Sequence, residues 1–191
     1  LVSGTTYYWR IDEVTDTNTV VGDIWTFETS GASPSGYVYL TWKTDPTNSI
    51  VVNWWNSVAA GDSTVEYGLT SSYGLSVYNA AVSNYHHVEL TNLIPGATYH
   101  YRVKSSDGYT GQDATFTVPL RNKTAFKFAI YGDTRGIDPP GDSTIYHNRH
   151  QLVANWIAAR DFEFVIQTGD MVNEGSRLDD WVNFYKAEAT L

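Results

Sequence analysis

The amino-acid sequence predicts a mainly β protein with a partial α/β segment in its carboxyl-terminal third. Three observations lead to this prediction. Aromatic residues make up 15% of the 191 residues, and their flat side chains suit the half-buried surface of a sheet. An aromatic pattern recurs after about 90 residues, the length of one β-sandwich module. After Pro119 the apolar spacing changes from that of strands alone to that of alternating strands and helices.

The internal repeat joins the beginning of the chain to the end of the predicted sandwich. Residues 1–11 read LVSGTTYYWRI, and residues 93–103 read LIPGATYHYRV. The segments WTFET at 25–29 and ATFT at 114–117 follow them in the same order. Residues 1–30 are therefore predicted to be a partial β hairpin, the last two strands of a preceding sandwich.

Residues 31–36 combine Gly, Ser and Pro and are predicted to be a linker. Beyond it, short apolar segments recur at the spacing of an antiparallel sandwich. Leu93, Pro95, Gly96 and Tyr99 have the spacing of a tyrosine corner, in which the tyrosine hydroxyl bonds to nearby backbone. The expected strands are 37–42, 50–54, 63–67, 75–81, 87–93, 98–104 and 114–118.

This segment resembles a fibronectin type III module. More specifically, the segments 50–54, 65–68 (VEYG), 87–90 (HVEL) and 93–101 resemble the amino-terminal domain of purple acid phosphatases. The resemblance implies a fibronectin type III-like β-sandwich over residues 37–119, followed along the chain by a catalytic domain. His86 and His87 fall on one of its strands, where packing and cross-strand hydrogen bonds are their expected roles.

Residues 124–191 are predicted to be a βαβα segment with two parallel strands. The apolar runs 126–131 and 162–166 fit strands, and the segments 144–160 and 178–189 fit helices. The positions that define the first helix are the apolar residues 145, 152, 153, 156 and 157, with Ser143 or Thr144 as its N-cap.

Each of the two predicted strands is followed by Gly-Asp, at Asp133 and Asp170. Parallel neighbours end at the same edge of a sheet, where ligands of α/β proteins collect, so the two carboxylates are expected to converge. Like charges repel, and a cation between them would remove the repulsion. The alternative is that each Gly-Asp is an ordinary turn or helix N-cap. Two of them in one βαβ unit favour a metal site.

The segments 128–136 (FAIYGDTRG) and 165–175 (VIQTGDMVNEG) resemble the first two motifs of the calcineurin-like metallophosphoesterases. The resemblance implies that Asp133 binds one metal ion and that Asp170 bridges two, which are Fe, Zn or Mn in divalent or trivalent form. It also implies an acid phosphatase-like hydrolase, in which a metal-bridging hydroxide attacks a phosphate mono- or diester. The substrate would be a phosphorylated small molecule or another phosphoester.

The segment departs from that family in two places. Arg135 replaces an expected histidine ligand, and its guanidinium cannot bind a metal. It is expected instead to contact the substrate phosphate or to orient Asp133. Asn173 replaces the tyrosine of the purple enzymes, so no coloured iron–tyrosinate is expected, although Asn173 remains a weaker ligand candidate. His147 and His150 are further weak candidates, one helical turn apart, and an exposed helix face is the alternative.

The family's later histidine motifs do not occur in this sequence, so the segment is expected to be a truncated domain with little activity alone. The chain also begins with Leu rather than Met, as a piece of a longer protein would. The net charge of −9 and the 12 dispersed Lys and Arg exclude a nucleic-acid-binding patch. No apolar run is long enough to span a membrane. Without cysteines, neither disulfides nor thiolate metal sites can form.

Fibronectin-like arrays without cysteine suggest a secreted or cell-surface bacterial protein. Two other functions stay open. The first alternative is a non-catalytic extracellular binding or adhesion array with a degenerate phosphoesterase remnant. The second is an array of carbohydrate-binding modules with an unrelated α/β domain. In both, exposed Tyr and Trp of the sandwich modules would contact carbohydrate or a cell surface.

Overall fold

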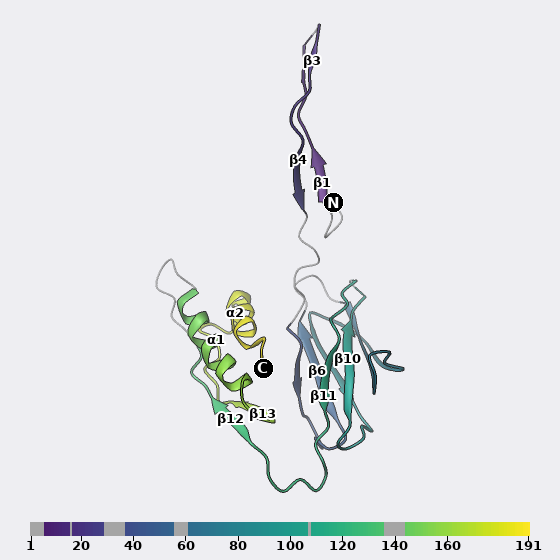
Figure 1. Cartoon of the computed structure of the whole chain (residues 1–191), viewed down its shortest axis with the longest axis vertical. Coiled ribbons are helices and arrows are strands. Elements are labelled where there is room, and N and C mark those ends of the chain that lie inside the picture. Colours follow the sequence, from purple (N-terminus) through teal and green to yellow (C-terminus); the bar gives the residue numbers. More distant parts are fainter. Residues whose placement is uncertain (1–5, 16, 29–36, 56–60, 107, 136–143) are drawn as a thin grey trace. The chain divides into compact units, whose positions relative to one another are not determined.

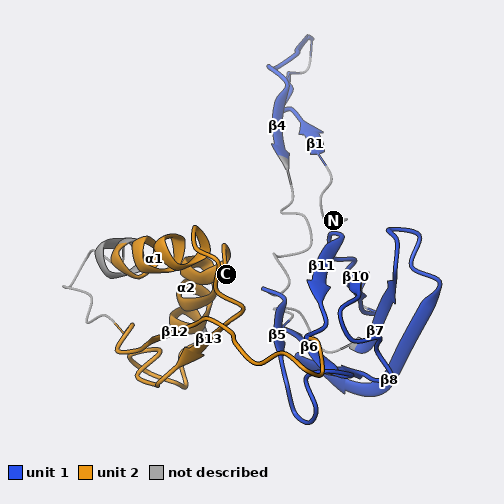
Figure 2. Ribbon diagram, turned by 60° about the horizontal axis from the view of Figure 1, so that its bottom comes forward, with its two compact units in different colours: residues 1–119 blue, residues 120–191 orange. Residues whose placement is uncertain are grey.

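The computed structural model describes residues 6–15, 17–28, 37–55, 61–106, 108–135 and 144–191 (Figure 1). The chain divides into two compact units, Leu1–Pro119 and Leu120–Leu191 (Figure 2). Each unit is built around its own sheets, so each is described by itself.

Seven strands of the first unit form an antiparallel β-sandwich, which confirms the predicted fold class. One sheet has the order β5-β6-β9 and the other has the order β11-β10-β7-β8. Each strand overlaps one predicted segment, with ends that differ by a few residues. The strands are β5 (Tyr39–Thr41), β6 (Ile50–Trp55), β7 (Gly61–Gly68), β8 (Leu75–Ser83), β9 (Tyr85–Leu90), β10 (Thr98–Lys104) and β11 (Ala114–Thr117).

The core of the sandwich lies between the two sheets. Val52, Val65 and Leu90 are fully buried, and Trp54 is almost so. The imidazole of His86 stacks on the Trp54 indole, with ring centroids 4.6 Å apart. The packing role expected for His86 is therefore confirmed.

The tyrosine corner is present as predicted. The hydroxyl of Tyr99 accepts a hydrogen bond of 3.2 Å from the backbone N–H of Ile94. Between them Gly96 has a φ of 81°, which suits glycine because it lacks a Cβ. The N–H of Gly96 donates to the carbonyl of Val118 at 2.8 Å, so the corner is tied to the chain that leaves the last strand.

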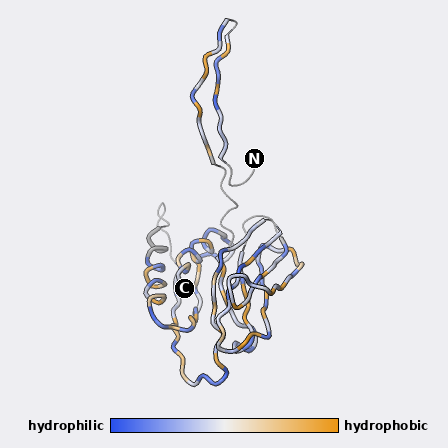
Figure 3. The backbone as a smooth tube through the Cα atoms, turned by 45° about the vertical axis from the view of Figure 1, so that its right-hand side comes forward, coloured by the Kyte–Doolittle hydropathy of each residue, from blue (hydrophilic) through white to orange (hydrophobic). Residues whose placement is uncertain are grey.

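The amino-terminal strands form a long hairpin with sheets of its own. Tyr7 pairs with Phe27 and Trp9 pairs with Trp25 in antiparallel register. Apolar residues recur along both arms of this hairpin (Figure 3), and several are largely exposed. The strands are β1 (Thr6–Trp9), β2 (Glu13–Val14), β3 (Thr19–Val20) and β4 (Trp25–Glu28).

The second unit has the predicted βαβα order. Its two strands are parallel and pair Phe128 with Phe164 and Tyr131 with Gln167. The two helices pack against each other, as Figure 2 shows in orange. The elements are β12 (Phe128–Tyr131), α1 (Thr144–Ala158), β13 (Phe164–Gln167) and α2 (Leu178–Glu188).

Of the apolar positions that predicted helix α1, Ile157 is buried. Residues 152, 153 and 156 are exposed, with Leu152 at 68%. The buried positions are His150, Ala154 and Ile157, which follow one another at helical spacing. The small Ala154 suits the close approach of a neighbouring helix, and His150 finds a partner on α2. Of the predicted α1 features, Ser143 and the side chains at 144 and 145 lie outside the described residues.

Candidate metal centre

Strands β12 and β13 bring the two predicted metal ligands to one edge of their sheet. The last residues of the paired strands are Tyr131 and Gln167. Asp133 and Asp170 follow within the next few residues. The two Gly-Asp loops therefore leave the sheet side by side, because neighbouring parallel strands end at the same edge.

Backbone hydrogen bonds continue between the two loops beyond the strands. The N–H of Asp133 donates to the carbonyl of Gly169 at 3.1 Å. The N–H of Arg135 donates to the carbonyl of Asp170 at 2.9 Å. Each aspartate thus has its main chain bonded to the opposite loop, so the two loops are held in a fixed relation to one another.

Both aspartates have a left-handed backbone conformation. Their φ angles are 54° at Asp133 and 56° at Asp170. Among the residues that the structure describes, Tyr73 and Asn92 are the other non-glycine residues with positive φ. This region is sparsely populated by L-residues, although aspartate enters it more readily than most, and such residues cluster at functional sites. What sets these two aspartates apart is that they share this conformation at neighbouring strand ends of one sheet.

The glycine before each aspartate is required for a different reason. A Cβ on Gly132 would lie 2.1 Å from the hydroxyl oxygen of Thr168. That hydroxyl donates a hydrogen bond of 3.2 Å to the carbonyl of Tyr131, so it cannot move without cost. Gly169 has a φ of 110°, which L side chains rarely adopt. Close approach therefore explains one glycine, and backbone conformation explains the other.

Arg135 forms an ion pair with Asp170 rather than with Asp133. Its Nε lies 2.6 Å from Asp170 Oδ2, and both side chains are partly exposed, at 51% and 39%. An orienting role of Arg135 toward Asp133 stays a prediction. A cation for the carboxylate pair is thus supplied by the chain itself, two residues beyond the first aspartate. The predicted contact to a substrate phosphate stays a prediction.

The described residues supply only part of a metal-ligand set. No group of three or more His, Cys, Asp or Glu that could hold a metal occurs among them. Asn173 is exposed to solvent on the loop after β13. His147 lies in α1, and its side chain lies outside the described residues. Further ligands would have to come from elsewhere.

His150 is buried instead of lying on an exposed helix face, so that alternative is wrong for this residue. Its side chain is 4% exposed, and its Nε2 lies 3.1 Å from Glu188 Oε1. The hydroxyl of Tyr131 donates to the same oxygen. Burial, followed by the bond to Glu188, raises the pKa of Tyr131 above its ordinary value of 10.0, so this phenol remains a donor. Sequence reasoning missed Glu188, whose only signal is its place one turn after the apolar Phe184.

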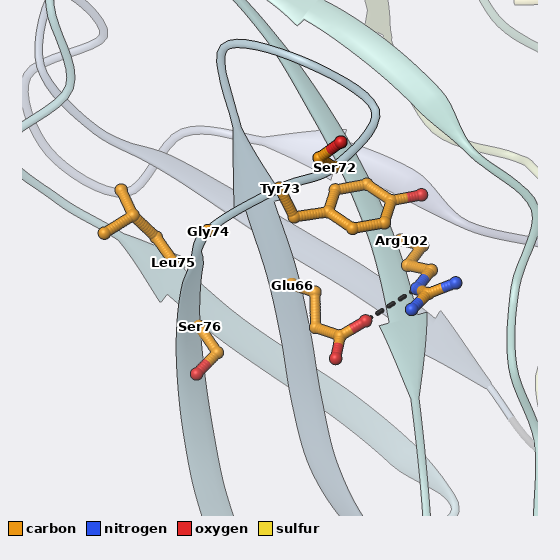
Figure 4. Close-up of a pocket in the computed structure, with 7 residues that line it drawn as sticks. All are labelled: Glu66, Ser72, Tyr73, Gly74, Leu75, Ser76 and Arg102. Carbon is orange, nitrogen blue, oxygen red and sulfur yellow. Dashed lines mark hydrogen bonds and ion pairs between the residues drawn. The ribbon is translucent and has the colours of Figure 1, made fainter.

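A separate pocket of about 260 Å³ lies on the four-stranded sheet of the sandwich (Figure 4). The Nε of Arg102 lies 2.6 Å from Glu66, and the Lys104 Nζ lies 3.3 Å from the same carboxylate. The Arg102 guanidinium also stacks 4.8 Å from the centre of the Tyr73 ring. These groups compensate one another and form a structural network. The pocket is lined by Glu66, Ser72, Tyr73, Gly74, Leu75, Ser76 and Arg102.

Comparison with known families identifies the class of the sandwich. Residues 36–118 match the family model of the purple acid phosphatase N-terminal domain. The match covers the β-sandwich and agrees with the resemblance drawn from its sequence. No match is found among curated proteins. Among the described helices, none has the length and apolar content needed to cross a membrane.

Several solved structures are similar to this chain, and the match to PhoD supports the fold. The structure of PhoD matches with a TM-score of 0.51 and 16% identity, over 82% of this chain and 35% of that one. This chain thus spans about a third of the PhoD structure. The third fibronectin III domain of human KIAA0343 protein is 16% identical, with a TM-score of 0.35 over 48% of this chain and 85% of that one. An fn3 domain of human contactin 1 is 14% identical, with a TM-score of 0.38 over 49% and 83%.

Proposed function

We propose that residues 124–191 form the amino-terminal portion of a calcineurin-like metallophosphoesterase domain, which hydrolyses a phosphate mono- or diester. The observation that carries the proposal is the pair of left-handed aspartates, Asp133 and Asp170, on hydrogen-bonded loops at one sheet edge. Two unrelated turns would have no reason to share both the conformation and the edge. A metal site, in which both carboxylates face one cation, would explain why the two loops share the conformation and the edge.

The donor chemistry of these residues fits a hard metal ion. Carboxylate oxygens suit divalent and trivalent cations of the kind used in phosphoester hydrolysis. Arg135 Nε lies 2.6 Å from Oδ2 of Asp170, and the proposal gives Oδ1 of Asp170 to a metal. When bound, the metal ions would polarise the phosphoryl oxygen and lower the pKa of the attacking water. Asp133 would serve one ion and Asp170 would serve both.

Arg135 has the chemistry of a phosphate-binding residue. Its side chain is half exposed, and its Nε lies 2.6 Å from the carboxylate of Asp170. A planar guanidinium binds phosphate oxygens through two parallel hydrogen bonds. We infer that Arg135 contacts the substrate phosphate when a bound metal ion replaces it as the partner of the Asp170 carboxylate.

The proposed domain organisation places two sandwich segments before the catalytic portion. Residues 1–30 are the last strands of a fibronectin type III-like domain, and residues 31–36 are a linker. Residues 37–119 are the purple acid phosphatase N-terminal-like sandwich, supported by the family match over residues 36–118. Such modules are frequent in exported proteins, which supports a secreted or surface location for the parent protein.

Metal binding by the chain can be measured directly. Addition of Mn²⁺ to residues 1–191 should broaden the backbone NMR signals of Asp133 and Asp170 at concentrations that leave the sandwich signals sharp. Asp170→Asn should abolish the selective broadening. Asp161→Asn is the matched control, because Asp161 is a 96% exposed carboxylate of the same unit. Equal broadening in both variants would contradict a metal site at Asp170.

Catalysis is a property to test in the whole parent protein. With Mn²⁺, Zn²⁺ or Fe²⁺ supplied, it should hydrolyse p-nitrophenyl phosphate or its diester. Asp170→Asn should lower kcat/KM by at least about 100-fold, since it removes a ligand of both ions. Undiminished activity in that variant would refute the mechanism, whatever the metal.

A non-catalytic binding array is the second candidate function. It is favoured by the exposed amino-terminal hairpin, where Trp9 and Trp25 stack with centroids 6.0 Å apart and are 44% and 60% exposed. Exposed aromatic rings of this kind are enriched at binding interfaces. Titration of soluble polysaccharides should then shift the tryptophan fluorescence of the wild type but not of Trp9→Ala. No shift in either protein would remove this candidate.

A further inference from the structure

Three elements of the α/β unit meet at a single carboxylate oxygen. Glu188, in the last turn of α2, accepts a hydrogen bond on Oε1 from the hydroxyl of Tyr131, the last residue of β12. The Nε2 of His150 on α1 lies 3.1 Å from the same oxygen. One acceptor thus joins a strand to both helices, across 57 residues of sequence in the case of Tyr131.

This network lies within the packed part of the unit. The His150 side chain is 4% exposed and that of Glu188 is 21% exposed. The His150 ring packs 6.0 Å from the Tyr131 ring and 5.1 Å from the Phe184 ring. In such surroundings an unmade hydrogen bond is costly, so the bonds fix the relative placement of the three side chains.

Tyr131 also carries the start of the Asp133 loop. Its carbonyl accepts hydrogen bonds from both the N–H and the hydroxyl of Thr168, at 2.9 and 3.2 Å. Two residues further on, Asp133 adopts its left-handed conformation. The main chain of Tyr131 is therefore held by Thr168, which follows β13, and its side chain is held by Glu188.

We propose that Tyr131, His150 and Glu188 are positioning residues, which hold the end of β12 so that Asp133 keeps its left-handed conformation opposite the Asp170 loop. Their importance for metal binding rests on the function proposed above. Their effect on the loop itself does not, because it can be measured without metal. None of the three side chains is assigned to contact the metal or the substrate.

The test removes the hydrogen bond between Tyr131 and Glu188 and follows hydrogen exchange at the backbone amides of the Asp133 loop. In Tyr131→Phe, hydrogen exchange at the amides of Asp133 and Arg135 should become about tenfold faster, as expected for the loss of one supporting hydrogen bond. Amides in the middle of α2 should change by less than about twofold. A merely structural role would instead accelerate exchange in the whole unit by one common factor.

Thr190→Ala is the matched control. The Thr190 hydroxyl donates to Asn155 Oδ1 at 2.9 Å and so also links α1 to the residues just after α2, in a bond in which β12 takes no part. Exchange at Asp133 and Arg135 should be the same in this variant as in the wild type. Equal acceleration in the control and in Tyr131→Phe would overturn the proposal.

Glu188→Gln keeps the test decisive if Tyr131→Phe does not fold. Its amide oxygen still accepts the Tyr131 hydroxyl, but without the negative charge. Exchange at Asp133 should then rise by only about two- to threefold, and unchanged exchange at Asp133 would overturn the proposal. A Mn²⁺ titration of the wild type separates the two hypotheses. If Mn²⁺ does not bind but the loop amides respond as stated, the positioning role stands and the metal site fails.

Discussion

Two hairpins of this chain share one local design and differ in what covers them. Tyr7 pairs with Phe27 in the first, and Tyr99 pairs with Phe116 in the second. The rings of each pair stack in nearly the same way, with centroids 5.6 and 5.7 Å apart and interplanar angles of 17° and 14°. The repeat in the sequence thus reproduces both the register and the side-chain geometry.

Burial separates the two pairs. Tyr99 and Phe116 are 4% and 8% exposed, because the opposite sheet of the sandwich covers them. Phe27 is 43% exposed. Either hairpin can therefore form a stacked aromatic pair across its two strands by itself. Burial of that pair from water requires a second sheet. The same pair should stabilise one hairpin far more than the other.

The largest expected effect is at the buried phenylalanine. Phe116→Ala should lower the free energy of unfolding of the sandwich by about 3–5 kcal/mol, since it removes a packed ring and leaves a cavity. Phe27→Ala should change it by less than about 0.5 kcal/mol. Urea unfolding followed by the fluorescence of the buried Trp54 measures both. Similar losses in the two variants would mean that the first hairpin is also covered.

A smaller difference is expected for the tyrosine hydroxyls. Tyr99→Phe leaves the backbone N–H of Ile94 without its acceptor and should cost about 1–2 kcal/mol. Tyr7→Phe, at the equivalent position of the first hairpin, should leave unfolding of the sandwich unchanged. The same urea experiment compares them. A loss below about 0.5 kcal/mol for Tyr99→Phe would show that water replaces the hydroxyl at the corner.

The smallest effect concerns the arginines of the repeat. Arg102 pairs across its sheet with Glu66 on β7, whereas Arg10, at the equivalent position, pairs with the nearby Asp12. The hydrogen bond from Arg102 holds the pKa of Glu66 below its ordinary value of 4.5. This pair stabilises the sandwich above pH 4.5, and the contribution is lost as the pH falls through the lowered pKa.

Glu66→Gln should accordingly flatten the acid side of the stability profile. The effect should stay below about 1 kcal/mol, since the pair is partly exposed and screened by solvent. Urea midpoints between about pH 2.5 and 6 give the measurement, with Arg10→Met as the control. A profile that is unchanged by Glu66→Gln, or equally flattened by Arg10→Met, would contradict the cross-sheet pair as its source.

The sequence alone determined the elements and their order. Alternating apolar residues are local signals, so the seven sandwich strands and the βαβα order could be read directly from it. The positions of Asp133 and Asp170 at one sheet edge also followed, because topology requires neighbouring parallel strands to end together. The aromatic repeat likewise predicted the amino-terminal hairpin.

Only the tertiary structure decided which side chains meet. Arg135 forms an ion pair with Asp170, and Glu188 contacts Tyr131 and His150, which lie on two other elements. These partners lie 35 to 57 residues apart in sequence, and periodicity carries no information on such pairs. The buried face of α1 was decided in the same way. His150 is buried because Glu188 on α2 provides a hydrogen-bond partner for its ring, whereas Leu152 is exposed to solvent.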